Sequence, residues 1–317
     1  MLCKLTKYKK FLSLLIIISL FITLTGCWDH RELDQLAIVA GMAFDKHPED
    51  KIWLTTQIIS PEEVGSSAST GGGGGGGIPY LNLSSIGENV FDAVRNANHD
   101  SPRRLFFAHN YTVIMSEELA RSGIQNYFDW YMRDVETRST VWVLISEQKA
   151  RDILNTQPKL AKIPGLYINE LFTNRAAVSK SPKVNMKDFV QRVLSDTTAP
   201  IAPLVHVMEH AQEKSPGLIG TAVFNKELKM VGKLNGIETR GMLWVLGEVE
   251  SGIITVKAPN FKENAALEIL NAKSSIKPLI EGNNIKIIIK VRVESNLGEP
   301  SSLFFTISSL SAKITSF

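Results

Sequence analysis

The first 27 residues constrain this chain most, because they carry the pattern of an exported, lipid-modified protein. Four lysines and no acid lie in the first ten residues, and residues 11–25 carry no charge. A basic start followed by a short apolar run is typical of a secretory signal peptide, and the run is shorter than the ~20 apolar residues of a transmembrane helix. Leu24-Thr25-Gly26-Cys27 follows at once. We therefore predict cleavage between Gly26 and Cys27, with diacylglycerol and palmitate attached to Cys27. The alternative is an uncleaved N-terminal anchor.

The predicted cleavage of the signal peptide determines which cysteines and charged residues the mature chain keeps. Cys3 leaves with the signal peptide, so the remaining cysteine is the acylated Cys27, and we expect neither an intrachain disulfide nor thiol catalysis. Loss of four lysines leaves 31 basic residues against 32 acidic ones, which gives no support for nucleic-acid binding. We expect a lipid-anchored protein on the outer face of the cell membrane.

Hydrophobic periodicity favours an α+β fold, because strands and helices alternate without a strict βαβ rhythm. Residues 36–44 and 52–59 predict a hairpin around a polar turn over residues 45–50. Ser85 and Glu88 have the spacing of a capping box and predict a helix start. Further helices are predicted at 117–122, capped by Ser116, and at 125–133, 148–154, 166–173, 187–194 and 238–246. Further strands are predicted at 111–115, 140–145, 219–224, 230–233, 252–257, 267–276 and 285–293.

Composition shifts predict three segments. Residues 1–26 are the signal peptide, and residues 27–212 are an N-terminal α+β domain with a glycine-rich loop over 65–77. Residues 213–317 are a C-terminal, antiparallel, β-rich domain. In the strand over 285–293, Ile287, Ile289, Val291 and Val293 face one way while Lys286, Lys290 and Arg292 face the other, so the apolar face is expected to need a cover.

The sharpest candidate for chemistry is His206-Val207-Met208-Glu209-His210, an H-x-x-E-H pattern. On a helix, the two histidines could bind zinc with Glu209 as base. Residues 200–205 contain two prolines and favour extended backbone instead. In a strand, residues 206 and 210 lie about 13 Å apart, too far to share a metal. We expect no zinc site, and the histidines then lie in solvent or at an edge.

Other candidate sites are weaker. The glycine tract has no Gly-Lys-Ser/Thr and leads into Ile78-Pro79, so it is not a phosphate cradle. His99 and His109 flank residues 103–107 (RRLFF), which are interpreted either as a cation–π or carboxylate-binding patch or as a structured turn whose aromatics enter the core. We expect no catalytic residues, no metal and no cofactor.

Several short segments, in this order and spacing, resemble one family. They are Gly26-Cys27-Trp28-Asp29, Arg31-Glu32-Leu33, Gln57-Ile58-Ile59-Ser60-Pro61, residues 103–110 (RRLFFAHN), residues 117–124 (EELARSGI), Ala222-Val223-Phe224-Asn225-Lys226, Leu228-Lys229-Met230-Val231-Gly232 and Glu238-Thr239-Arg240-Gly241. Together they resemble the C-subunit lipoproteins of bacterial spore germinant receptors, the Ger(x)C family. The resemblance extends to about Glu299.

The resemblance implies a membrane-anchored subunit of a nutrient germinant receptor in the inner membrane of the spore. Its implied partners are integral membrane A- and B-type subunits, and the family has no known enzymatic activity or cofactor. It implies a mixed α/β fold in three domains. Only Cys27 carries over as a functional residue, and the ligand-binding residues are unknown. Residues 301–317 do not resemble the family, so we expect the last domain to be truncated. The alternative function is that of an extracytoplasmic solute-binding lipoprotein.

Overall fold

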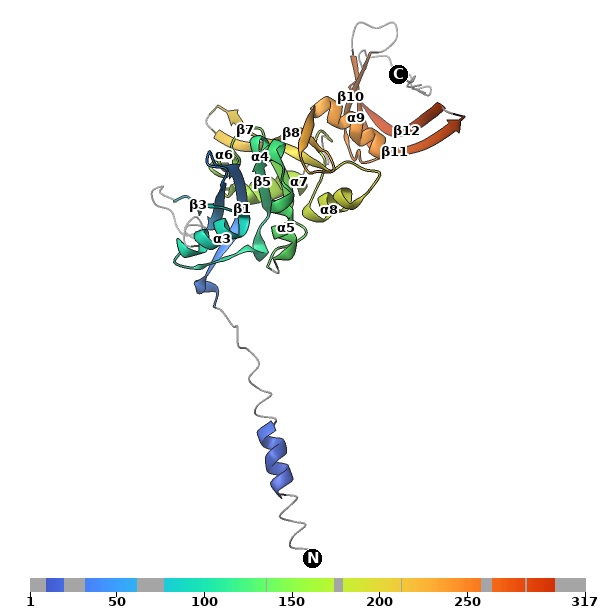
Figure 1. Cartoon of the computed structure of the whole chain (residues 1–317). Coiled ribbons are helices and arrows are strands. Elements are labelled where there is room, and N and C mark those ends of the chain that lie inside the picture. Colours follow the sequence, from blue (N-terminus) through green and yellow to red (C-terminus); the bar gives the residue numbers. More distant parts are fainter. Residues whose placement is uncertain are drawn as a thin grey trace, which may run out of the picture. The chain divides into compact units, whose positions relative to one another are not determined.

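The computed structural model describes residues 10–19, 32–61, 77–134, 136–173, 179–211, 213–257, 264–282 and 284–299 (Figure 1). Residues 10–19 form an exposed helix in a first unit, Met1–Leu36, and a second unit spans Ala37–Phe317. No described helix is long and apolar enough to cross a membrane. The predicted cleavage site at Gly26 and Cys27, the expected glycine-rich loop except Gly77, and the tail from residue 300 lie outside the described residues.

The elements follow one another in an irregular order. The strands are β1 (Leu36–Lys46), β2 (Ile52–Ile59), β3 (Tyr80–Gly87), β4 (Arg104–Phe106), β5 (Thr112–Ser116), β6 (Trp142–Ser146), β7 (Ile201–His210), β8 (Glu213–Phe224), β9 (Met230–Asn235), β10 (Gly252–Lys257), β11 (Asn264–Glu281) and β12 (Asn284–Glu299). The helices are η1 (Leu33–Gln35), α3 (Val90–His99), η3 (Phe107–His109), α4 (Glu117–Ser122), α5 (Gln125–Arg133), α6 (Ala150–Leu154), α7 (Pro164–Thr173), α8 (Met186–Leu194) and α9 (Gly236–Leu246).

Most described strands form one mixed sheet in the order β3-β2-β1-β5-β6-β7-β8-β9, with β4 paired to β1. The central strands β1, β5, β6 and β7 are parallel. Antiparallel pairs flank this centre, β1-β2-β3 on one side and β7-β8-β9 on the other. The combination of a parallel centre with antiparallel hairpins confirms the predicted α+β class.

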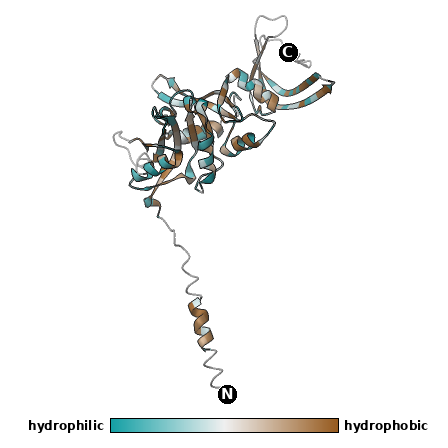
Figure 2. Cartoon of the chain, viewed as in Figure 1, coloured by the Kyte–Doolittle hydropathy of each residue, from teal (hydrophilic) through white to brown (hydrophobic). Residues whose placement is uncertain are grey.

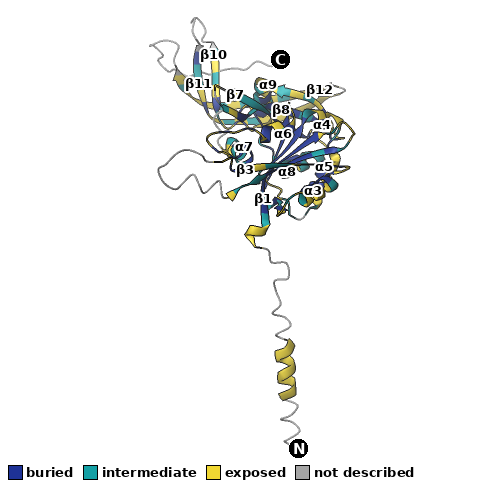
Figure 3. Ribbon diagram, turned by 90° about the vertical axis from the view of Figure 1, so that its left-hand side faces the viewer, coloured by how far each residue is buried: buried dark blue, intermediate teal, exposed yellow. Residues whose placement is uncertain are grey.

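Alternate side chains of the central strands enter two hydrophobic cores on opposite faces of the sheet. Met42 and Phe44 pack with α3, α5 and α8, whereas Ala43 between them packs with α6 and α7. β5 and β6 follow the same alternation. Because a strand turns successive side chains to opposite faces, helices cover the large sheet on both sides, and buried residues concentrate there (Figure 3).

The predicted elements around this sheet are largely confirmed. β1 and β2 pair as the expected hairpin, although Asp45 and Lys46 belong to β1 rather than to the turn. The Ser116 hydroxyl accepts from Leu119 N and caps α4, and α5 spans the predicted 125–133. Asn235 and Glu238 form a capping box at the start of α9.

The helix start predicted at Ser85 is wrong. Ser85 lies in β3, which pairs with β2 from Ile52↔Gly87 to Ile59↔Tyr80. Its hydroxyl donates to Ala93 O at 2.8 Å, and α3 begins only at Val90, capped by Asn89. Backbone pairing along eight residues therefore outweighs a local capping pattern.

A buried amide joins β2 to both helices on the second face. Gln57 is fully buried, and its Nε2 donates to Leu154 O at 2.9 Å while its Oε1 accepts from Gly165 N at 2.9 Å. Asn82 Nδ2 also donates to Leu154 O, at 2.8 Å. A side chain at Gly165 would put its Cβ 2.5 Å from Ala40 O, so glycine is required where α7 starts against β1.

The connection between β2 and β3 is closed at its base. Ile59 and Tyr80 are register partners, and Ser60 N donates to Pro79 O at 2.9 Å. The glycine-rich segment departs from this closed base.

The second sheet is smaller and largely exposed. β10, β11 and β12 pair antiparallel in that order, and β11 and β12 form a long ribbon. Helix α9 packs on its base, where Leu243, Val249 and Ile269 are buried and Ala272 and Val293 are half-buried.

The apolar face expected to need a cover is only partly covered. Val291 and Val293 are half-buried near α9, but Ile287 is 62% exposed and Ile289 is 45% exposed. The alternation was therefore predicted correctly, and the described residues leave its outer part open to solvent.

The hydrogen-bonded large sheet continues through the predicted domain boundary. β7 ends at His210 and β8 begins at Glu213, and the two strands are paired from Ile201↔Val223 to His210↔Glu213. A change in architecture comes later, after α9. The division at residue 212 stays a prediction, and it would have to cut through this sheet.

Candidate functional site

The candidate site lies where the parallel strands of the large sheet end. The carboxyl ends of parallel strands meet at one edge, which is where open sheets usually carry their binding sites. Asp45 lies near the end of β1, Glu117 directly follows β5, and Glu147 directly follows β6. β7 pairs with β6 at Leu204 and Val205 and then runs on beside β8. Charged side chains from distant parts of the chain are thus collected on one edge.

Asp45 holds the start of α6. Its carboxylate accepts from Ala150 N at 2.7 Å and from Arg151 N at 3.1 Å. Burial raises the pKa of Asp45, and the two backbone hydrogen bonds oppose this shift. Lys149, the N-cap residue of α6, makes no side-chain cap, so β1 supplies the cap from elsewhere in the chain. We assign Asp45 a structural role.

Lys233 of β9 connects two of the carboxylates. Its Nζ lies 2.8 Å from Glu147 Oε1 and 3.4 Å from Glu117 Oε2, and Arg121 Nη2 lies 2.6 Å from Glu117 Oε1. The hydrogen bond with Glu147 raises the pKa of Lys233. Burial raises the pKa of Glu117, but its bonds to Arg121 and Lys233 outweigh burial and leave that pKa lowered. Alternating charges therefore hold β9, α4 and the end of β6 together.

His206 of β7 also lies at this charged edge. Its Nδ1 lies 3.8 Å from Glu147 Oε2 and has no hydrogen-bond partner among the described residues. At this distance a neutral imidazole contributes little.

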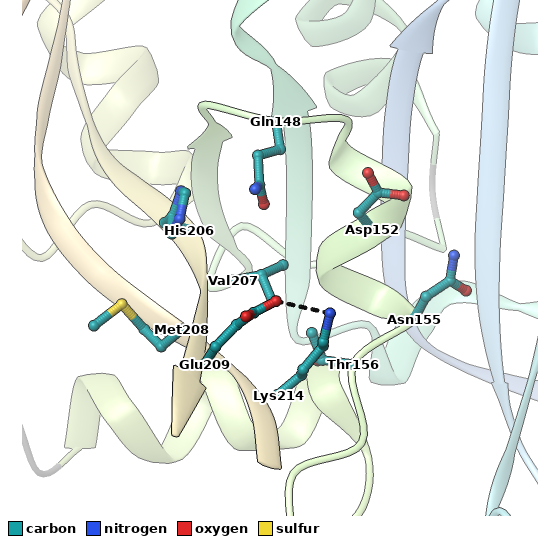
Figure 4. A pocket seen from close by; sticks show the side chains of 9 residues that line it. All are labelled: Gln148, Asp152, Asn155, Thr156, His206, Val207, Met208, Glu209 and Lys214. Carbon is teal, nitrogen blue, oxygen red and sulfur yellow. Dashed lines mark ion pairs between the residues drawn. The ribbon is translucent and has the colours of Figure 1, made fainter. Parts of the chain in front are cut away.

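A polar hollow of about 670 Å³ opens beside His206 (Figure 4). Part of its wall comes from α6 and the residues around it, and the rest from the β7–β8 hairpin. Its lining residues are Gln148, Asp152, Asn155, Thr156, His206, Val207, Met208, Glu209 and Lys214. Glu209 and Lys214 form an ion pair of 2.7 Å across the hairpin. The Lys214 ammonium lowers the pKa of Glu209, so this carboxylate is ionised and paired at neutral pH.

The H-x-x-E-H pattern lies on a strand, as its prolines predicted. His206, Glu209 and His210 all belong to β7. A strand turns residue 206 to one face and residue 209 to the other, which separates a histidine and a glutamate that a zinc hydrolase would bring together. The described residues contain no group of three or more potential ligands placed to hold a metal. Absence of bound zinc stays a prediction.

The basic and aromatic segment over residues 103–107 has a structural role, because most of it forms β4 and the start of η3 rather than the expected turn. Leu105 and Phe107 are buried in the core, and Arg104 is paired with Glu136. His109 lies against Phe106 with 5.8 Å between ring centroids. Of the two interpretations, the one with aromatics in the core fits this arrangement.

Two family sequence models match the chain. The spore germination protein N-terminal domain matches residues 29–207, and the spore germination B3/GerAC-like C-terminal domain matches residues 219–312. Together they cover most of the sequence. This chain belongs to the Ger(x)C family of spore germination proteins.

Individual Ger(x)C relatives from Bacillus subtilis (strain 168) agree with this assignment. Spore germination protein KC is 30% identical over 303 residues, which cover 90% of this chain and 74% of the relative. Spore germination protein YndF is 28% identical, with 93% and 77% covered. The crystal structure of the GerBC protein covers 88% of this chain and 76% of its own, at 17% identity and a TM-score of 0.45. The two family models and the two Bacillus subtilis relatives show that the protein has a role in spore germination.

The Ger(x)C match also corrects one expectation and leaves another open. Its C-terminal part extends to residue 312, beyond the expected end of the resemblance at Glu299. Its two parts divide between residues 207 and 219, close to the predicted boundary, whereas the sheet itself is continuous there.

The residues of the candidate site that sequence reasoning missed belong to the charged edge. Asp45 was assigned to a turn, and Glu117, Glu147 and Lys233 were not singled out. A usable signal was present for Glu117 and Glu147, since each directly follows a strand that ends in serine. Nothing local connects Lys233 to them.

Proposed function

We propose that the mature chain is the lipid-anchored subunit of a nutrient germinant receptor. Acyl chains on Cys27 hold it on the outer face of the cell membrane, which becomes the inner membrane of the spore. It assembles there with integral membrane A- and B-type subunits. The family match carries this proposal, because it begins at residue 29, just after the predicted acylated cysteine. One acyl chain anchors a protein marginally, whereas two anchor it stably.

The protein acts by binding and assembly rather than by catalysis. At the charged edge, Glu117, Glu147 and Glu209 are each paired with a cation. Asp45 is committed to the start of α6. These pairings leave the carboxylates engaged in holding strands and helices together. This supports a scaffold whose surfaces make the functional contacts.

The anchor is tested by Cys27→Ala in the native chain. Wild-type protein should incorporate labelled palmitate and sediment with membranes, and the variant should incorporate none. Palmitate incorporation into Cys27→Ala protein would refute the assignment. A Cys3→Ala variant is the matched control and should be labelled like the wild type.

The receptor role is tested by deleting the gene and exposing spores to a panel of nutrient germinants. We expect loss of the response to one class of nutrient, with the response to the others retained. Wild-type protein should restore it and Cys27→Ala should not. A second receptor with the same specificity could mask the loss, so the deletion is also made in a strain that lacks the other receptors. Normal germination of those spores on every nutrient would contradict the proposal.

The hollow beside His206 is the one observation that favours a solute-binding lipoprotein instead. Such proteins usually enclose ligand between two α/β lobes, whereas this hollow lies at the edge of a single sheet. Thermal stabilisation of the mature chain by a nutrient, abolished by Asp152→Asn, would favour this alternative. A neighbouring gene for an ATP-binding transporter would favour it too.

A further inference from the structure

The β11–β12 ribbon carries five cations on one face. We name this the basic face and define it by Lys273, Lys277, Lys286, Lys290 and Arg292, all of which are exposed. Directly opposed residues of an antiparallel pair project to the same side. The pairs Lys273↔Arg292, Ser275↔Lys290 and Leu279↔Lys286 therefore lie on this face.

The other face of the ribbon is the one that meets α9. Ala272 and Val293 pack against the helix, and the Ser274 hydroxyl donates to Trp244 O. These residues alternate with the basic ones along both strands, as the alternating colours of the ribbon in Figure 2 show. The basic face consequently points away from α9 and from the apolar residues beside it.

The described residues balance the charge of the basic face only in part. None of the ion pairs between described residues involves any of its five cations, and the acids on the same face are Glu281 and Glu294. Lys273 and Arg292 stand directly opposite each other, which destabilises a strand pair. A solvated strand face gains nothing from this arrangement, whereas an anionic partner would relieve the repulsion.

The distance over which these cations are distributed indicates what kind of anionic partner could contact all of them. From Lys273 to Leu279 the ribbon extends about 20 Å, at ~3.4 Å per residue. One phosphate or carboxylate could touch only part of it. Leu279 and Ile288 lie on the same face, among the lysines, and Leu279 is 42% exposed. Aliphatic side chains surrounded by lysines are typical of surfaces that lie in the headgroup region of a bilayer.

We propose that the basic face binds the surface of an anionic lipid membrane. Its lysines and arginine contact lipid phosphates, and Leu279 and Ile288 enter the headgroup region. The proposal rests on the proposed lipid anchor, because the anchor keeps the chain beside a membrane and raises the effective concentration of lipid. An acidic protein surface is the competing occupant, and the experiment separates the two.

The test uses residues 28–317 without the acyl group and vesicles of phosphatidylcholine, alone or with one third phosphatidylglycerol. We expect co-sedimentation with the anionic vesicles at low ionic strength, about tenfold or more above that with neutral vesicles and suppressed by salt. Neutralising the basic face in K273Q/K277Q/K286Q/K290Q/R292Q should abolish it. The matched control neutralises five exposed cations elsewhere, Arg103, Lys149, Lys159, Lys180 and Lys187.

Several outcomes would overturn the proposal. These are failure of the wild type to bind anionic vesicles, equal binding to neutral vesicles, and equal loss in the two neutralised variants. Failure to bind lipid together with binding to a polyglutamate column would assign the face to an acidic protein. Because the tested chain carries no lipid, the result is independent of palmitate labelling at Cys27.

A second measurement does not require removing charge. Residues 28–317 contain no cysteine, so a single cysteine can carry an environment-sensitive dye. Dye at Ile288→Cys, on the basic face, should shift towards the blue with anionic vesicles. Dye at Ile287→Cys, the neighbouring residue on the opposite face, should shift much less. An equal or reversed pair of shifts would contradict the proposed orientation.

Discussion

The two sheets of this protein follow the same side-chain alternation but differ in how they are covered. Helices cover both faces of the large sheet, so Phe172 of α7 is only 1% exposed. The small sheet has α9 on the base of one face, and Ile287 of β12 is 62% exposed. Alternation therefore determines which side a residue faces. Whether that side is buried depends on a second layer contributed by a distant part of the chain.

The largest expected effect contrasts one buried residue of the first region with one exposed residue of the second. Phe172→Ala should lower the free energy of unfolding by about 3 to 5 kcal/mol, because it leaves a cavity next to Trp142, whose ring stacks on Phe172 at 4.2 Å. Ile287→Ala should change it by less than about 0.5 kcal/mol. Urea unfolding of the two variants measures both.

The contrast would fail if the two substitutions had similar cost. A large loss for Ile287→Ala would mean that its face is covered in solution. A small loss for Phe172→Ala would mean that α7 is not integral to the large sheet.

The next effect concerns the buried amide of the large sheet. Gln57→Ala should cost about 2 to 3 kcal/mol, because Gly165 N loses its buried acceptor and Leu154 O loses a donor. Gln148→Ala, at an exposed position of the hollow, is the control and should cost almost nothing. Equal melting temperatures for the two variants would show that the hydrogen bonds of the Gln57 amide do not stabilise the large sheet.

Two capping boxes allow a finer comparison, since one begins α8 on the large sheet and the other begins α9, which packs on both sheets. Asn185→Ala removes the cap of α8 and Asn235→Ala that of α9, and each should cost about 1 kcal/mol. If the sheets unfold independently, the two losses appear in separate transitions. A single calorimetric transition that shifts equally in both variants would show one cooperative unit, despite the unequal cover.

The smallest effect is the pH dependence of the charged edge. The pKa of Glu117 is lowered in the folded state, so its contribution to stability is present above its ordinary value of about 4.5 and is lost as the pH falls through the lowered pKa. Lys233→Gln should make the free energy of unfolding fall less steeply as the pH decreases. At neutral pH it should lower that free energy by less than about 1 kcal/mol, because the ammonium is half-exposed. Stability curves from pH 3 to pH 7 test the sign. A steeper acid limb in the variant would contradict it.

Local sequence was sufficient where neighbouring residues determine the structure. The β1–β2 hairpin, the Ser116 cap and α5 were predicted because each depends on residues within one element or turn. β3 was not, because its pairing with β2 spans the glycine-rich segment. The extended backbone of β7 was predicted from its prolines. It excludes the helical form of the H-x-x-E-H pattern.

The candidate site could be predicted far less well than the fold. Lys233 is 86 residues from Glu147 and 116 residues from Glu117, so no spacing rule connects them. Asp45 resembles a turn residue in sequence and becomes a buried cap only because α6 starts beside β1, 105 residues later. Such pairs depend on strand order, and strand order was not predicted.

The hydrogen bond between Ser60 and Pro79 makes the connection between β2 and β3 a suitable place for inserting extra sequence. That bond and the Ile59↔Tyr80 pair hold the two ends of the loop together. Lengthening the loop should cost little stability, because the entropy of closing a loop grows only slowly with its length, by about 0.6 kcal/mol per doubling. An epitope or a small fluorescent domain inserted there would be carried at the edge of the large sheet. The protein could then be followed in living spores while both of its sheets stay unaltered.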